Sequence, residues 1–160
     1  QRFAYHERDE FSQAVLHFFV QHQVVLVLLY YTRFVGAPLY DAFPTLNIHP
    51  SLLPQFTGLN PLARQLAAHV PLIGATLHQV DARCDGGPIL AQIANRYTAE
   101  TAERISFLQK IYLTLAAVDH YLIKGTARFE DYLNANLGLS TAAHEYMCTM
   151  ETLHQQRVLA

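Results

Sequence analysis

The sequence predicts an α/β domain in which helices flank a mostly parallel β-sheet, with a helical extension at the C-terminal end. Two observations lead to this prediction. Short, apolar, β-branched runs alternate along the chain with segments of helical periodicity, and the connections between them are short. The chain has 160 residues, of which 51% are hydrophobic and 15% charged, so we expect one core of ordinary size and not a disordered chain.

The individual elements follow from the spacing of apolar residues. Helices are expected at residues 9–22, in a short turn at 39–43, after a cap at Asn60 with Pro61 in the first turn, and at 100–123 and 141–158. Strands are expected at residues 24–30, 45–49, 72–80 and 91–97. The first of these strands has no polar alternation, which is typical of a parallel strand covered on both faces.

Charge, cysteine content and hydropathy exclude several classes of protein. Eleven basic residues against thirteen acidic ones give a net charge of −2, without the basic excess of a nucleic-acid binder. Two cysteines are too few for a disulfide scaffold and indicate a reducing, cytoplasmic compartment. The longest apolar run, residues 24–31, is too short to span a membrane, and acidic residues stand where a signal peptide has positive charge. We expect no nucleic-acid or membrane partner.

The beginning of the sequence departs from a complete doubly wound domain. Such a domain opens with a strand and a glycine-rich phosphate turn, whereas this chain begins at Gln1 and opens on a helix. No G-x-G-x-x-G pattern occurs in the sequence. We therefore expect the phosphate-binding front part of the fold to be missing from it.

An amide and an imidazole stand two positions apart at the carboxyl end of the second predicted strand, as Asn47 and His49. Because side chains alternate along a strand, both face the same side, at the end of the sheet where α/β domains bind ligands. An amide donor stabilises a developing oxyanion, and an imidazole moves a proton or adds positive charge, so the pair suits acyl transfer. The residues alone leave another interpretation open, in which Asn47 satisfies loop backbone and His49 is a partly buried ring.

A carboxylate, Asp85, precedes two glycines and a proline, a pattern typical of a tight and rigid loop. If the strands that carry His49 and Asp85 are neighbours, Asp85 can orient the imidazole or bind a water molecule. The alternative, a turn aspartate bonded to its own backbone, also stays open. The histidines at 78, 144 and 154 do not have the spacing of metal ligands, so we expect no metal site.

Two motifs carry a specific resemblance to a known family. The string Asn47-x-His49-Pro50-Ser51-Leu52-Leu53-Pro54 and the later Asp85-Gly86-Gly87-Pro88 resemble those of the folate-dependent formyltransferases. Further matches, in order and separation, are Gly58, residues 74–78, residues 89–92 and the segment Tyr31-Thr32-Arg33-Phe34. The resemblance covers residues 11–123 and implies a partial Rossmann-like fold of the formyltransferase type.

The resemblance also implies an activity and a site. The activity is transfer of a formyl group from 10-formyltetrahydrofolate, as co-substrate, to the amine of glycinamide ribonucleotide. Asn47 would donate to the tetrahedral oxyanion, as would His49 when protonated. Asp85 would hold the histidine and an ordered water that relays the proton from the amine to the leaving folate. The residues implied in binding the folate are Thr32, Arg33, Phe34, Val35, Val80, Asp81 and Cys84.

Two other functions remain open within the resemblance. One is hydrolysis of formyltetrahydrofolate, in which water is the acceptor and no phosphate anchor is needed. The other is a truncated paralogue that binds folate or a partner protein without turnover. We expect residues 1–125 to form the catalytic part and residues 126–160 a helical extension packed on it. This extension matches the family poorly, and it either covers a sheet edge, forms a homodimer contact or is simply divergent.

Overall fold

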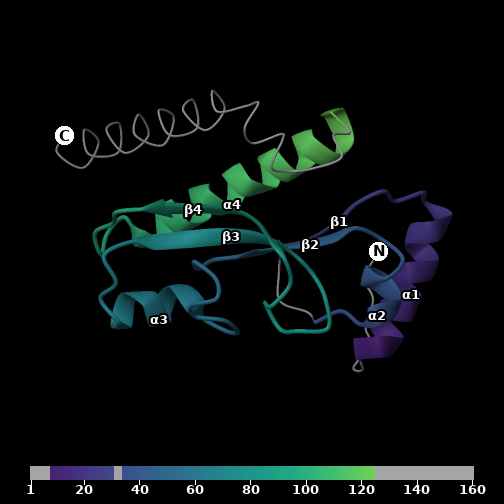
Figure 1. The fold of residues 1–160 in the computed structure, drawn as a ribbon, viewed down its shortest axis with the longest axis horizontal. Helices are drawn as coiled ribbons and strands as arrows, with labels where there is room; N and C mark the ends of the chain where they lie inside the picture. Colours follow the sequence, from purple (N-terminus) through teal and green to yellow (C-terminus); the bar gives the residue numbers. More distant parts are fainter. Residues whose placement is uncertain (1–7, 31–33, 125–160) are drawn as a thin grey trace.

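The structure, a computed structural model, describes residues 8–30 and 34–124 (Figure 1). The predicted helix at 141–158, the extension 126–160 and the two residues Thr32 and Arg33 lie outside the described residues. The elements are α1 (Arg8–Gln21), β1 (Val27–Leu29), α2 (Ala37–Tyr40), β2 (Thr45–His49), α3 (Pro61–Ala67), β3 (Ile73–Gln79), β4 (Ile89–Asn95), α4 (Ala102–Val118) and the π-helix η1 (Asp119–Lys124). No helix among these is both long and apolar enough to cross a membrane.

The four strands form one mixed sheet in the order β1-β2-β3-β4. Only β1 and β2 are parallel, whereas β2 with β3 and β3 with β4 are antiparallel. The α/β class is confirmed, but the prediction of a mostly parallel sheet is wrong for the described residues. The physical reason lies in the connections after β2 and β3. Each returns the chain to the sheet at the end it has just left, without the crossover that a parallel neighbour requires.

One face of the sheet packs against α4, and this packing sorts the side chains of the central strands. Leu46 and Ile48 on β2, with Ala75 and Leu77 on β3, form a buried core with Leu113 and two alanines of α4. Figure 1 shows α4 running along one side of the strands and α3 lying on the other. Since side chains alternate along a strand, the residues between these apolar positions face away from α4.

The first strand is shorter and more exposed than the sequence predicts. β1 contains only three residues, and Val25, within the predicted strand, is 65% exposed. Val27 packs with Val15 of α1, Val35 and Leu39 in a second core at this end of the sheet. Leu28 packs against the core on the α4 side and Leu29 against the second core, so both faces of β1 are covered as predicted, although β1 is short and is an edge strand among the described residues.

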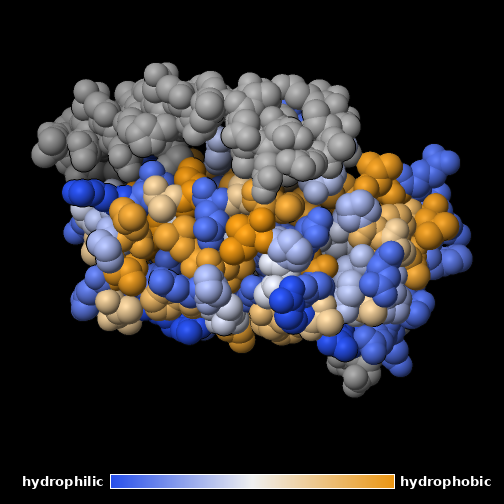
Figure 2. Space-filling model, in the orientation of Figure 1, coloured by the Kyte–Doolittle hydropathy of each residue, from blue (hydrophilic) through white to orange (hydrophobic). Residues whose placement is uncertain are grey.

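The opposite edge of the sheet also keeps apolar surface. β4 alternates between exposed and half-buried positions, and its first residue, Ile89, is 46% exposed. Figure 2 shows hydrophobic residues along the middle of the viewed face, over the strands, interspersed with hydrophilic ones. Burial of apolar area is therefore incomplete on this sheet, which bears on how the chain behaves in solution.

Two helix ends differ from their predicted form. Asn60 does precede α3, but it has a φ of 52° and makes no side-chain cap bond, so it serves as a left-handed residue that asparagine tolerates. The α-helix predicted to reach residue 123 ends at Val118 and continues as the π-helix η1. The helical path is thus as long as predicted, with a change of hydrogen-bond pattern in its last six residues.

Candidate functional site

Four polar side chains meet on the sheet face that points away from α4. Asn47 and His49 come from β2, and His78 from β3 lies directly opposite Asn47 in the antiparallel register. Asp85 enters from the loop between β3 and β4. Its carboxylate lies 3.4 Å from His49 Nδ1, 3.4 Å from Asn47 Nδ2 and 3.7 Å from His78 Nε2. The structure thus brings together the three residues that the sequence singled out, and it adds His78.

Both ring nitrogens of His49 face hydrogen-bond acceptors. Nε2 lies 2.9 Å from the carbonyl oxygen of Phe56, and Nδ1 faces the Asp85 carboxylate. A carbonyl and a carboxylate only accept hydrogen bonds, so the doubly protonated ring alone satisfies both contacts. The side chain is almost fully buried, with 5% of the residue exposed. The geometry therefore suits a doubly protonated, positively charged His49 ring held between these two acceptors.

Asp85 is held in place by the backbone on either side of the site. Asp85 has a φ of 50°, in the left-handed region. This backbone conformation fits the tight loop that the sequence predicts at this position. The N–H of Gly58 donates to Asp85 Oδ2 at 2.8 Å. Gly58 has a φ of 80°, which glycine adopts without steric cost. With 13% of its side chain exposed, Asp85 retains some access from outside.

His78 is the site residue that sequence reasoning missed. Its Nδ1 donates to the carbonyl oxygen of Gln79 at 2.8 Å, and its Nε2 accepts from Asn47 Nδ2 at 3.2 Å. Burial lowers the pKa of His78 below its ordinary value, with the Gln79 bond and the charge of Asp85 opposing this shift. The ring is therefore neutral beside the charged His49. His78 lies opposite Asn47 because β2 and β3 are antiparallel. The sequence analysis expected parallel strands and therefore did not place His78 in the site.

The residues implied in folate binding have different surroundings. Phe34 is 62% exposed, whereas Val35 is buried in the core at the β1 end, so only its backbone is available to a ligand. Val80 lines a cavity of about 310 Å³ between residues 40–46 and the end of β3. A cavity of this size lies at the lower end of the range for small-molecule pockets.

Two further predicted residues stand in the loop before Asp85. Asp81 accepts hydrogen bonds from the backbone and guanidinium of Arg83, which lower the pKa of the Asp81 carboxyl. Cys84 is exposed, and its thiol lies 3.7 Å from Asp85 Oδ2. Partial desolvation of the sulfur, followed by the charge of Asp85, raises the pKa of the Cys84 thiol. The thiol therefore stays protonated next to the carboxylate.

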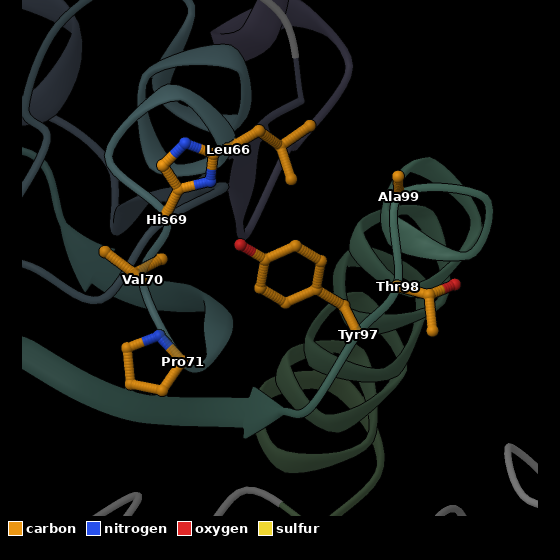
Figure 3. Close-up of a pocket in the computed structure, with 7 residues that line it drawn as sticks. All are labelled: Leu66, His69, Val70, Pro71, Tyr97, Thr98 and Ala99. Atoms are coloured by element: carbon orange, nitrogen blue, oxygen red, sulfur yellow. The ribbon is translucent and has the colours of Figure 1, made fainter.

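A larger cavity, about 430 Å³, lies away from this cluster. Leu66, His69 and Val70 line it near the end of α3, and Tyr97 lines it from the β4–α4 connection, with its hydroxyl pointing toward α3 (Figure 3). None of the four clustered side chains lines this cavity. Within the described ranges there is also no group of three or more metal-ligating side chains.

The cluster has the parts that acyl transfer to a nucleophile requires. A buried positive ring and an amide donor stabilise negative charge on a carbonyl oxygen. A carboxylate with some exposure accepts and returns a proton. The contacts of Asn47, at 3.2 and 3.4 Å, are at the long end for hydrogen bonds, so an oxyanion can compete for its hydrogens.

Comparisons with known proteins agree with this chemistry. A family model described as formyl transferase matches residues 1–111. Phosphoribosylglycinamide formyltransferase from Bacillus subtilis is 38% identical over 108 residues, which are 63% of this chain and 55% of that protein. Formyltetrahydrofolate deformylase from the same organism is 37% identical over 105 residues, 61% of this chain and 35% of the relative. The solved structure of phosphoribosylglycinamide formyltransferase from Campylobacter jejuni has a TM-score of 0.65 and 26% identity, covering 72% of this chain and 65% of that one.

The chain thus spans 55% and 35% of the lengths of these two curated relatives. The matched region nevertheless contains Asn47, His49, His78 and Asp85, together with the whole sheet. Because the family model covers most of the chain and the structural likeness extends over the same part, the chain belongs to the formyl transferase family.

Proposed function

We propose that this chain transfers a formyl group from 10-formyltetrahydrofolate to the amine of glycinamide ribonucleotide. Family membership supports formyl transfer, and relatives named for this reaction support the acceptor. The observation that carries the proposal is the approach of Asp85 to both His49 and Asn47 at 3.4 Å. Without that approach, ancestry would be the only support.

In the proposed reaction the amine attacks the formyl carbon, and the carbonyl oxygen becomes an oxyanion. Asn47 Nδ2 supplies a hydrogen to this oxygen, exchanging one of its long contacts for a shorter one to a charged partner. His49 contributes a positive charge that the carbonyl of Phe56 and the carboxylate of Asp85 hold in place. These groups are oriented before the reaction starts, which is what makes such stabilisation effective.

A proton must then leave the attacking amine and reach N10 of the folate. Asp85 is the member of the cluster suited to this step, because it is an acceptor with partial access from outside. It takes the proton directly or through an ordered water and returns it to N10 as the C–N10 bond breaks. His49 and His78 are less suited, since both are buried and both have their ring nitrogens engaged.

The proposed donor site lies between the segment before α2 and the loop before Asp85. Its members are the residues implied by the family resemblance: Thr32, Arg33, Phe34, Val35, Val80, Asp81 and Cys84. The exposed ring of Phe34 and the cavity lined by Val80 support this placement for an aromatic pterin. Val35 would contribute backbone groups alone.

A second candidate function is hydrolysis of formyltetrahydrofolate. The deformylase relative supports it, because its identity to this chain, 37%, is close to the 38% of the transferase relative. The same four side chains serve a water nucleophile equally well. Formate release in the absence of any amine distinguishes the two, since a transferase requires the acceptor and a hydrolase does not.

Activity of the full chain and of Asp85→Asn tests the proposal. Losing the proton acceptor is expected to lower the rate of formyl transfer by about 10²- to 10⁴-fold. Asn47→Ala is expected to cost about 10²- to 10³-fold through the lost oxyanion donor. Glu103→Gln, an exposed carboxylate-to-amide change on α4, is the matched control. Equal rates in the wild type and Asp85→Asn contradict the assignment.

Binding of a folate analogue by calorimetry completes this test. Binding without turnover would indicate the non-catalytic paralogue instead, and turnover would exclude it.

We also propose a cytoplasmic location and a homodimer. The location rests on the low cysteine content, and the homodimer rests on the apolar sheet edges. Neither bears on the chemistry of the cluster.

A further inference from the structure

The loop that follows β2 supplies two of the backbone groups that hold the site. The carbonyl of Phe56 accepts from His49, and the N–H of Gly58 donates to Asp85. The loop is stiffened internally, because Ser51 Oγ donates to the carbonyl of Gln55 at 2.7 Å and the N–H of Gln55 donates to the carbonyl of Leu52 at 2.9 Å. Whatever fixes residues 51–55 therefore also fixes the groups that face His49 and Asp85.

The loop is fastened to the sheet through Thr76. This residue lies opposite His49 in the register of β2 and β3 and is fully buried. Its hydroxyl donates to the carbonyl of Ser51 at 2.6 Å and accepts from the N–H of Leu53 at 3.0 Å. Gly74, two residues earlier on the same face, leaves the space that the side chain of Leu52 occupies. The loop thus lies flat against β3.

A single side chain from the next strand completes this fastening. Gln92 is opposite Thr76 on β4, and its Nε2 donates to the Thr76 hydroxyl and to the carbonyl of Leu53, both at 2.9 Å. Both hydrogens of the Gln92 amide are therefore used in hydrogen bonds, one to the loop at Leu53 and one to Thr76, which holds the loop. This is an uncommon use for an exposed residue of an edge strand, since such side chains usually contact solvent.

We propose that Gln92 is a positioning residue of the site. Its hydrogen bonds to Thr76 and Leu53 fix the loop after β2. The Phe56 carbonyl and the Gly58 N–H of this loop in turn orient His49 and Asp85. The inference rests on the proposed function only for its kinetic consequence. Gln92 contacts neither His49 nor Asp85, so it acts through the backbone of the loop.

The test replaces Gln92 with methionine, which keeps the length of the side chain and removes both donors. The position is exposed, so the variant is expected to fold, and circular dichroism verifies this. Loss of these two hydrogen bonds loosens the loop and is expected to lower kcat about tenfold, with the KM of the formyl donor unchanged. Gln92→Lys provides two donors again and is expected to restore most of the rate. Gln21→Met, the same change at an exposed position on α1, is the control.

A second measurement does not depend on turnover. Amide hydrogen exchange at Gly58 and the ring nitrogen signals of His49 report directly on the loop and the imidazole. Both are expected to change in Gln92→Met and to return in Gln92→Lys. Unchanged exchange and ring signals overturn the inference even if the chain is active. Changed signals in a chain without formyl transfer uphold the positioning role and refute the proposed function alone.

Discussion

The uncharged state of the His78 ring is the feature of the site that a change of pH tests most directly. This ring is buried, donates from Nδ1 to Gln79 and accepts from Asn47 at Nε2. Adding a proton to Nε2 removes the acceptor for Asn47 and places a positive ring near His49. Burial lowers the pKa of His78 in the folded chain, so below about pH 6.5 the unfolded chain binds the proton more readily. The free energy of unfolding must therefore rise as the pH is raised toward about 6.5.

We predict that the stability advantage of the wild type over His78→Gln shrinks as the pH falls below 6.5. The slope is at most about 1.4 kcal/mol per pH unit, the value for one proton. Urea unfolding at pH 5, 6, 7 and 8 measures it. His17→Gln, on the exposed side of α1, provides the comparison for removing an imidazole outside the cluster. A constant difference between wild type and His78→Gln at all four pH values would show that folding does not lower the pKa of His78.

The same cluster shows what the sequence was able to predict at the residue scale. Asn47 and His49 were found because alternation along a strand puts both on one face, and Asp85 was found from the tight turn after it. The prediction that Asp85 lies near His49 depended on the strands beside them being neighbours. The pairing of β2 with β3, the strand that precedes the Asp85 loop, confirms this. His78 could not be found in this way, because its place opposite Asn47 depends on strand direction. Direction is set by the path of the connections, which a local pattern does not contain.

At the scale of elements, α1 supports the segment that the family resemblance assigns to folate binding. Ser12, fully buried, accepts from the N–H of Gly36 at 2.7 Å and donates to the carbonyl of Arg8 at 2.7 Å. A Cβ at position 36 would lie 2.5 Å from Asp9 Oδ1, a contact that the exposed Asp9 side chain relieves by rotating, so the tie between segment and helix is the Ser12 hydrogen bond. The helix thus fixes the backbone next to Phe34.

We predict that Ser12→Ala raises the KM of the formyl donor while kcat stays near that of the wild type. The N–H of Gly36 loses its buried acceptor, which costs about 1–3 kcal/mol of stability. Steady-state kinetics with varied 10-formyltetrahydrofolate measure the change. Ser106→Ala, another buried serine in a helix but on α4, is the matched control for the loss of a hydroxyl. An equal rise in KM for both variants would argue that general destabilisation, and not this contact, is responsible.

The elements themselves were predicted unevenly, for physical reasons. β2 was predicted to the residue because Pro50 ends it and polar positions alternate with apolar ones. β1 was overestimated because an apolar run has the same appearance whether or not a partner strand covers it, and here only Val27–Leu29 find a partner. The end of α4 depends on a change to π-helical bonding that no residue pattern announces.

For the whole molecule, the unequal covering of the sheet is the property with the largest consequence. Among the described residues β1 pairs only with β2, so one row of its backbone groups has no strand beside it. Val25 and Tyr30, at 65% and 39% exposure, flank this edge with apolar surface. A net charge of −2 is too small to keep such chains apart by repulsion. An exposed apolar edge of this kind favours pairing with another chain.

We predict that the chain associates with itself through the β1 edge and that Val25→Lys weakens this association. A lysine at an edge places a charge where a second strand would have to bury it. Sedimentation velocity over a range of concentrations is expected to show a rising average sedimentation coefficient for the wild type and a flatter curve for Val25→Lys. Val20→Lys, at a 62% exposed position on α1, adds the same charge away from the edge and is expected to behave like the wild type. If both lysine variants dissociate alike, net charge governs association; if the wild type is monomeric throughout, the predicted homodimer is wrong.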